Sequence, residues 1–282
     1  MHPVLRLIRA GNAAVSFVGT AVAALAAEGT GFATSLDFVA TVLLASGSTF
    51  CVTAAGNVLN DVTDRDSDRV NHPDRPLVTG EVGTDSAKAL VVGLFVLGGA
   101  LIAPVVPGHP LVGLVFVAAV AALVAYELGL KARGLAGNAA VGFLTAAVFL
   151  YGGAAAGPIV PVLPLAAMAF GATLSREIIK DMEDAAGDVG RSTLPRVHGM
   201  ALASLAARGA VAAALALSPI PLLVSVPVLS VAGIMYLGLV VAADALFVLS
   251  VADLPARLHR EQSLSKGAMT VALLAFLALA FR

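Results

Sequence analysis

Long hydrophobic runs alternate with short polar segments along almost the whole of this sequence. The runs reach or exceed the ~20 residues that a helix needs to cross the apolar core of a bilayer. Two of them, 89–126 and 134–174, contain no Asp, Glu, Lys or Arg. Proline and glycine at 104–110 and 157–164 favour a turn that divides each of these two runs. The pattern therefore predicts nine membrane-spanning helices, at residues 9–27, 38–60, 88–106, 110–126, 138–156, 161–179, 200–218, 222–243 and 265–281.

The composition supports this all-α, polytopic membrane fold. Of the 282 residues, 59% are hydrophobic, and the mean hydropathy is +0.95, far above that of soluble globular proteins. A soluble enzyme is excluded on this ground, and no nucleic-acid partner is expected. We expect one domain, residues 1–282, forming a helical bundle around a central cavity. The lone Cys51 can form no intrachain disulfide and is expected to pack in the core of the second span.

The lysines and arginines follow the alternation of the predicted spans. They lie at the start of the first span and in or beside the connections that follow spans two, four, six and eight, whereas the other connections contain none. Under the positive-inside rule, this places the N-terminus and the polar connections on the cytoplasmic side of a cell membrane, with the C-terminal Arg282 outside. Only Arg208 falls well inside a span, where it either snorkels to the cytoplasm or lines the cavity.

The most polar segment, Asn57 to Leu77, follows a long uncharged run and contains five of the eighteen acidic residues. If the helix of that run continues, Asn60, Asp64 and Asp68 fall at i, i+4 and i+8 and spread over about 80° of one face. Carboxylates on one face repel each other unless a counterion lies between them. The spacing therefore indicates Mg²⁺ or a similar hard cation with oxygen ligands. The alternative is a solvated loop after a membrane helix.

A second acidic stripe begins in the sixth span. Its spacing of 4, 3 and 4 residues places the acidic side chains on one helical face, and Lys180 lies off that face. Because the second and sixth spans run in the same direction, the two stripes would emerge on one side of the membrane and face each other across one cavity. Asp64 then matches Asp184 in an internal repeat of about 120 residues, helices 1–4 and 5–8, in parallel topology. The stripe consists of Glu177, Asp181, Asp184 and Asp188.

Two facing carboxylate clusters with basic residues between them describe a site for a metal and a highly charged anion. Diphosphate fits, because Mg²⁺ bridges carboxylate and phosphate oxygens while Arg and Lys neutralise the remaining charge. A membrane-embedded cavity beneath the site would accept a long apolar tail, so a lipid diphosphate is the expected substrate. The candidate diphosphate-binding residues are Arg69, Arg75, Lys131, Lys180 and Arg191.

Other polar residues near the same membrane surface have two interpretations. Arg9 either snorkels to lipid phosphate or reaches an anionic substrate. Tyr126 and Lys131 either anchor their helix at the interface or take part in the site. The remaining candidates by position are Asn12, Asp61 and Glu177.

The two motifs resemble those of the UbiA-type intramembrane prenyltransferases. The segment NDVTDRDSD, followed by DRPL, is similar to the family's NxxxDxxxD motif, with Asn60, Asp64 and Asp68 in the named positions. Asp184 and Asp188 match the family's second motif, DxxxD. The resemblance covers essentially the whole chain, including the nine spans. Within the family, SREIIKDMEDAAGD followed by TLP is most similar to the archaeal digeranylgeranylglyceryl phosphate synthases.

This resemblance implies a prenyl transfer. A geranylgeranyl group would pass from geranylgeranyl diphosphate to the free hydroxyl of (S)-3-O-geranylgeranylglyceryl phosphate, forming the second ether bond of archaeal membrane lipids and releasing diphosphate. The family's YxxxK element is one residue longer here, with Tyr126 and Lys131 at its ends. The two motifs would each hold one Mg²⁺ and act in catalysis, the first through Asn60, Asp64 and Asp68 and the second through Asp181, Asp184 and Asp188.

Two other functions are compatible with the same features. An aromatic prenyltransferase of the same family, acting on 4-hydroxybenzoate or another quinone precursor, would use the same diphosphate site. A cation-coupled secondary transporter would also carry acidic residues in its membrane helices. Transporter sites lie near the midplane of the membrane, whereas both acidic stripes here lie at cytoplasmic helix ends, which favours the enzyme. The sequence leaves the oligomeric state open.

Overall fold

A computed structural model of the chain describes residues 2–29, 35–185 and 192–282, and this described part is helical, with no strand. The long helices are joined by short turns, some of which contain helices of a single turn. In chain order the helices are α1 (Pro3–Leu7), α2 (Ala10–Glu28), α3 (Leu36–Thr63), α4 (Arg65–Asn71), α5 (Pro76–Thr79), α6 (Thr84–Ile102), α7 (Pro110–Leu128), η2 (Leu130–Ala132), α8 (Leu135–Ala156), η3 (Val160–Val162), α9 (Leu163–Asp184), α10 (Leu194–Leu217), α11 (Ile220–Val224), α12 (Val231–Ala252), α13 (Leu258–Ala278) and η4 (Leu279–Phe281).

Nine helical segments within the described residues are long and apolar enough to cross a membrane. This confirms the all-α fold with nine spans. The eighth span is displaced from its predicted range of 222–243, because the short helix α11 takes up the first residues of that apolar run and α12 begins only at Val231. The ninth begins at Leu258 instead of residue 265, since a polar segment forms the first turns of α13.

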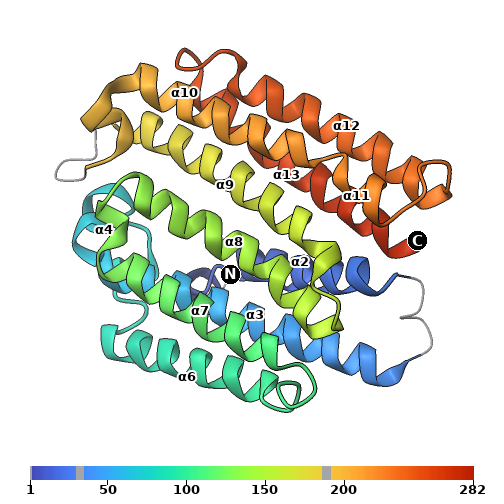
Figure 1. Cartoon of the computed structure of the whole chain (residues 1–282). Helices are drawn as coiled ribbons and strands as arrows, with labels where there is room; N and C mark the ends of the chain where they lie inside the picture. Colours follow the sequence, from blue (N-terminus) through green and yellow to red (C-terminus); the bar gives the residue numbers. More distant parts are fainter. Residues whose placement is uncertain (1, 30–34, 186–191) are drawn as a thin grey trace.

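The helices form two groups that meet along one seam (Figure 1). The first group contains α2, α3, α6, α7 and α8, and the second contains α9, α10, α12 and α13. Helix α8 packs against α9, and α13 packs against both α9 and α2, so the two groups close around a common interior. The bundle therefore brings the ends of α3 and α9, which carry the two acidic motifs, to the same end of the molecule.

Small residues allow the central helices to approach closely. Gly152 of α8 lies so near α2 that a Cβ atom there would stand only 2.3 Å from the carbonyl oxygen of Thr20. At Gly171 of α9, a Cβ atom would stand 2.9 Å from the carbonyl oxygen of Ala210 in α10. Close approach of this kind is a common means of helix association in membranes, where burying apolar side chains against each other gains little over contact with lipid.

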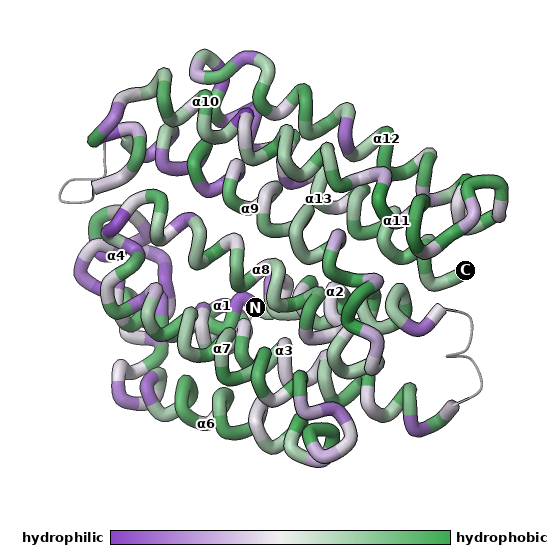
Figure 2. The backbone as a smooth tube through the Cα atoms, viewed as in Figure 1, coloured by the Kyte–Doolittle hydropathy of each residue, from purple (hydrophilic) through white to green (hydrophobic). Residues whose placement is uncertain are grey.

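The surface polarity matches a membrane-embedded bundle. In Figure 2, hydrophobic residues cover the length of the long helices, and hydrophilic residues gather at the end of the bundle where α4 lies. Helices α6 and α7 present large apolar side chains outward, and Val96 and Val117 are 65% and 63% exposed. An exposed apolar band of helix length is the surface that a bilayer covers. The chain is thus a multi-pass membrane protein.

Candidate active site

A cavity of about 1460 Å³ lies between the two helix groups. Eight of the long helices contribute to its described lining, and of the nine only α6 does not. The lining is polar toward the α4 end of the bundle and apolar further in, where Phe116, Leu144, Met168 and Phe276 contribute. Such a cavity accepts a molecule with a charged head and a long apolar tail.

The first acidic motif stands at a break between two helices. Helix α3 ends at Thr63, and Asp64 has backbone angles (φ −92°, ψ 4°) that separate it from α4. The helix whose continuation the motif spacing assumed is therefore interrupted at Asp64. The i to i+4 bonds nevertheless persist, from Asp64 N to Asn60 O at 2.9 Å and from Asp68 N to Asp64 O at 2.8 Å. Asn60, Asp64 and Asp68 thus remain one turn apart and all three line the cavity.

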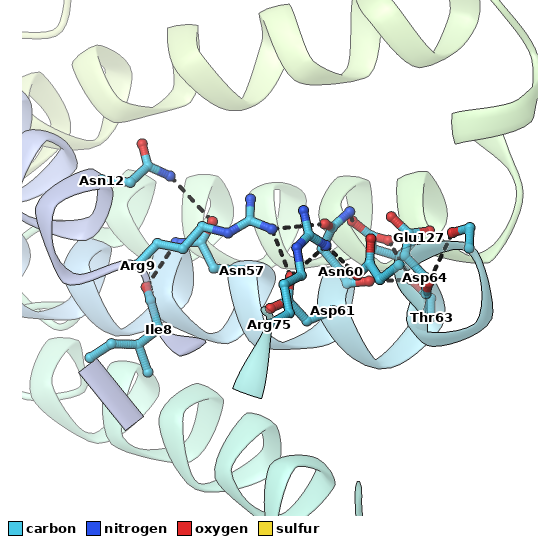
Figure 3. Close-up of polar contacts among 12 residues, drawn as sticks. Ile8, Arg9, Asn12, Asn57, Asn60, Asp61, Thr63, Asp64, Arg75 and Glu127 are labelled. Atoms are coloured by element: carbon cyan, nitrogen blue, oxygen red, sulfur yellow. Dashed lines mark hydrogen bonds and ion pairs between the residues drawn. The ribbon is translucent and has the colours of Figure 1, made fainter. Parts of the chain in front are cut away.

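Asp61 joins two arginines beneath this motif (Figure 3). Its Oδ1 accepts hydrogen bonds from Arg9 Nη2 at 2.6 Å and from Arg75 Nη1 at 3.1 Å. Arg75 also pairs with Asp68. Asp61 is 3% exposed and does not line the cavity, so it lies behind the motif and fixes the two guanidinium groups. A buried carboxylate of this kind is stable only with such partners.

Asn60 and Lys131 are held by Glu127 of α7. The Asn60 Nδ2 donates to Glu127 Oε1 at 3.1 Å, while Asn60 Oδ1 accepts from Arg9 at 3.3 Å, so the amide is used at both ends. Lys131 pairs with Asp64 and lies 3.6 Å from Glu127, with its ammonium 6.0 Å from the centre of the Tyr126 ring. The break in α7 at Gly129 and the short helix η2 turn Lys131 toward the first motif despite the extra residue in the YxxxK element.

The N-terminal segment closes this side of the site. Arg9 is the only described residue other than glycine with a positive φ (48°), a conformation that costs energy and is held here by its ion pair. Asn57 donates to the carbonyl of Ile8 at 2.9 Å and accepts from Asn12 at 3.2 Å. The hydrogen bond from Arg6 lowers the pKa of the exposed Glu81 carboxyl.

The second acidic motif lies on the opposite wall, at the end of α9. Asp181 and Asp184 line the cavity, and Asp181 Oδ2 accepts a hydrogen bond from Asn138 of α8 at 2.8 Å. Glu177 and Lys180 also line the cavity, and Glu177 accepts from Arg176 at 2.6 Å. The predicted helical stripe is thus present from Glu177 to Asp184. Asp188 and Arg191 lie outside the described residues.

The described carboxylates fit a metal that shares its ligands with a substrate. Among the described residues, no three Asp, Glu, His or Cys side chains are grouped as a metal site made by the protein alone. Asp64 and Asp68 instead face Asp181 and Asp184 across one cavity. Mg²⁺ is commonly bound by one or two carboxylates together with water and phosphate oxygens, and each wall offers two described carboxylates for such a site.

Besides Asp61, two other candidate residues do not line this cavity. Arg69 does not line it, is largely exposed and lies 3.5 Å from Asp66, so its position gives no support to a role in diphosphate binding. Arg208 does not line it either. The Arg208 guanidinium donates to the carbonyl oxygens of Val251, Ala252 and Leu254, at the end of α12, at 3.1, 3.3 and 2.9 Å. It therefore completes a helix terminus, as basic side chains commonly do.

Several cavity residues were not identified from the sequence. Glu127 and Asn138 are single polar residues at the ends of apolar spans, and only their partners in the fold distinguish them from surface anchors. Asp244 lies inside α12, lines the apolar part of the cavity and accepts a hydrogen bond from Ser218 at 2.7 Å. Lys266 belongs to α13 and also lines the cavity. The spacing of Glu127 and Lys131, four residues apart, was the one signal available.

Comparison with known proteins identifies the family. Residues 16–279 match the UbiA prenyltransferase family. The digeranylgeranylglyceryl phosphate synthase of Methanoregula boonei is 40% identical over 224 residues, covering 77% of this chain and 76% of the relative. That of Haloquadratum walsbyi is 38% identical over 275 residues, covering 96% and 91%.

Solved structures share the fold. A digeranylgeranylglyceryl phosphate synthase structure superimposes with a TM-score of 0.82 at 30% identity, covering 99% of this chain and 98% of the other. A UbiA homolog from Archaeoglobus fulgidus bound to GPP and Mg²⁺ gives a TM-score of 0.71 at 20% identity, with 99% and 98% covered. The match over nearly the whole chain, in sequence and in fold, means that this protein is a member of the UbiA prenyltransferase family.

Proposed function

We propose that this protein transfers a geranylgeranyl group from geranylgeranyl diphosphate to the free hydroxyl of geranylgeranylglyceryl phosphate. The observation that carries the proposal is the cavity with two facing carboxylate walls at its polar end and an apolar interior beneath them. The choice of donor and acceptor follows the digeranylgeranylglyceryl phosphate synthases to which the chain is similar. The reaction would take place within one domain that spans the whole chain.

The two walls would hold the diphosphate head through Mg²⁺. Asp64 and Asp68 would bind metal on one side, and Asp181 and Asp184 on the other, with Asn60 and Asp188 as further ligands from the motifs. When bound, Mg²⁺ neutralises the phosphate charge and makes diphosphate a better leaving group. The A. fulgidus homolog of the same fold was solved with this metal and a prenyl diphosphate.

The basic residues of the first wall would exchange partners as the substrate binds. Lys131 is paired with Asp64, and Arg75 is paired with Asp68. These are the two carboxylates that would bind metal. With those carboxylates as metal ligands, the Lys131 ammonium and the Arg75 guanidinium would be available to donate to phosphate oxygens. Asp61, which lies behind the motif, would keep Arg75 close to the site. Glu127, which lines the cavity beside the motif and lies 3.6 Å from Lys131, would do the same for Lys131.

The remaining residues would orient the two reactants and exclude water. The bond between the allylic carbon of the donor and its diphosphate oxygen breaks as the acceptor oxygen bonds to that carbon, and the hydroxyl proton passes to a carboxylate or to the departing diphosphate. The apolar part of the cavity holds the prenyl chain and keeps water from the cationic carbon. Stabilisation of the departing diphosphate is expected to be the largest contribution to catalysis.

We place the polar end of the bundle in the cytoplasm of the cell membrane, because the lysines and arginines concentrate in the connections at that end. The site would then open toward the compartment that supplies soluble Mg²⁺ and prenyl diphosphate. The C-terminal Arg282 would lie outside.

A turnover assay tests the proposed reaction. Purified protein in liposomes receives Mg²⁺ and labelled geranylgeranyl diphosphate, with geranylgeranylglyceryl phosphate and 4-hydroxybenzoate offered in parallel. We expect label in the doubly alkylated glyceryl phosphate and none on the aromatic ring. Label on the ring instead would contradict the proposed acceptor but would remain consistent with the proposed diphosphate site. Run on sealed vesicles of known orientation, the same assay tests the topology, since substrates added on the cytoplasmic face alone should support turnover.

A further inference from the structure

Six lysine and arginine side chains line the described part of the cavity, and their pairing divides them into two kinds. Four of them are bonded to carboxylates, and these are Arg9, Arg75, Lys131 and Arg176. Among the residues that the structure describes, Lys180 and Lys266 have no hydrogen-bonded or ion-paired partner for their ammonium groups. Both lysines are exposed at the cavity wall, so their ammonium groups are accessible to an anionic ligand.

Lys180 and Lys266 lie at about the same depth on neighbouring helices. Helices α9 and α13 pack together, and Glu183 contacts both His259 at 3.2 Å and Gln262 at 3.1 Å. Lys180 and Lys266 each lie about one helical turn further into the bundle than these contacts. Deeper still, Met168 of α9 and Phe276 of α13 belong to one buried apolar cluster, as expected for two packed helices that run antiparallel.

The cavity face of α13 has a charged head and an apolar tail. Lys266, Met269, Leu273 and Phe276 line the cavity at positions i, i+3, i+7 and i+10, which is one helical stripe. Thr270 adds one hydroxyl beside the lysine. The stripe therefore matches a molecule with one anionic group and a long apolar chain attached to it.

We propose that Lys266, with Lys180 beside it, binds the phosphate monoester of the acceptor lipid, whose chain lies along the α13 stripe. This inference rests on the proposed function and assigns a second anion site to it. The acceptor phosphate needs binding groups of its own, because it and the diphosphate are both anions and repel each other within one cavity. Lys266 stands on a helix that carries neither acidic motif, so it remains available to a second anion.

The assignment separates the two anions of the reaction. The diphosphate binds through metal to the two motifs, whereas the acceptor phosphate binds directly to ammonium groups and needs no metal. A charge-assisted hydrogen bond discriminates strongly for a ligand that carries the phosphate over one that lacks it. Lys266 would then be the residue that makes a glyceryl phosphate, instead of a neutral alcohol, the preferred acceptor.

The experiment measures probe binding in EDTA, so that it does not depend on turnover. The first probe is a radiolabelled geranylgeranylglyceryl phosphate whose free hydroxyl is methylated, and the second is the same compound without its phosphate. We compare the wild type with Lys266→Gln, Lys266→Arg and the control Lys88→Gln, which removes an exposed lysine of α6 outside the cavity. Lys266→Gln should lower the affinity for the phosphate probe, relative to that for the neutral probe, by roughly tenfold or more. Lys266→Arg should retain most of the wild-type preference for the phosphate probe.

The possible outcomes either support or overturn the assignment. The assignment would be overturned if Lys266→Gln lost affinity equally for both probes. It would also be overturned if Lys266→Gln preferred the phosphate probe over the neutral probe as strongly as Lys88→Gln does. A higher KM of Lys266→Gln for geranylgeranyl diphosphate at saturating acceptor would also overturn it, because the lysine would then serve the donor. If the wild type turns over the glyceryl phosphate and Lys266→Gln keeps its probe preference, only this inference fails. If the wild type transfers nothing to the glyceryl phosphate, the proposed function fails instead.

Discussion

Single residues of this site divide into those that face the cavity and those that hold the facing residues in place. Asp64, Asp68, Asp181 and Asp184 face it, whereas Asp61 lies behind the first motif. The adjacent residues Asn60 and Asp61 thus have different roles, since Asn60 lines the cavity and Asp61 accepts hydrogen bonds from two arginines. Asp61 is a positioning residue in this account, and it acts through Arg9 and Arg75.

Replacing Asp61 by Asn should therefore reduce both stability and rate. Asn keeps the shape but removes the charge that Arg9 and Arg75 share, so we expect the free energy of unfolding to fall by roughly 2 kcal/mol. The KM for geranylgeranyl diphosphate should rise, because Arg75 is no longer held beside the first motif. Thermal unfolding in detergent and steady-state kinetics measure the two effects. Asp66→Asn is the matched control, since Asp66 has a 93% exposed side chain. If Asp61→Asn behaves like this control, the positioning role is wrong.

The spacing of the acidic residues was enough to predict which carboxylates share a face. It was not enough to predict their partners. Arg75 reaches Asp61 and Asp68 only because the chain turns at residues 72–75 after α4, and Lys131 reaches Asp64 only because α7 ends before Gly129. Lys266 gave no signal of its own, since its role depends on α9 lying beside α13. The partners of these basic residues could not be predicted from the sequence, because they depend on contacts between segments that are distant in sequence.

At the scale of helices, hydropathy predicted the number of spans better than their ends. The mostly polar segment 258–264 forms the first turns of α13, and the apolar run near 222 contains a short helix, a turn and the start of α12. Hydropathy cannot separate these cases, because apolar turns and apolar helices look alike in composition. The helix ends instead depend on individual bonds, of which those made by Arg208 are the clearest.

Arg208 should be a stability residue and not a residue of the reaction. Arg208→Gln would leave carbonyl oxygens at the end of α12 without their hydrogen-bond donor. We therefore expect the free energy of unfolding to fall by roughly 1–3 kcal/mol. The KM values for both substrates should stay unchanged. Arg257→Gln is the control, since Arg257 has a 64% exposed side chain. A thermal unfolding midpoint equal to that of the control, or a selective rise in KM, would show that Arg208 acts otherwise.

At the scale of the whole molecule, the site exists only because the two helix groups meet. Asp64 belongs to the first group and Asp184 to the second, and the cavity lies between them. The two motifs occupy corresponding places at the ends of α3 and α9, as the predicted internal repeat of helices 1–4 and 5–8 would require. That repeat stays a prediction, and a duplication of this kind would explain why one acidic motif appears on each wall.

The central claim is that both acidic walls act together on one diphosphate. The most direct measurement is the rate of label transfer from geranylgeranyl diphosphate by Asp64→Asn and by Asp184→Asn, each compared with Asp66→Asn and each checked for an unchanged thermal unfolding midpoint. We predict that each of the two variants loses roughly 100-fold or more in rate, because each removes a ligand that stabilises the departing diphosphate. A folded variant of either residue that transfers the prenyl group at close to the control rate would contradict the account.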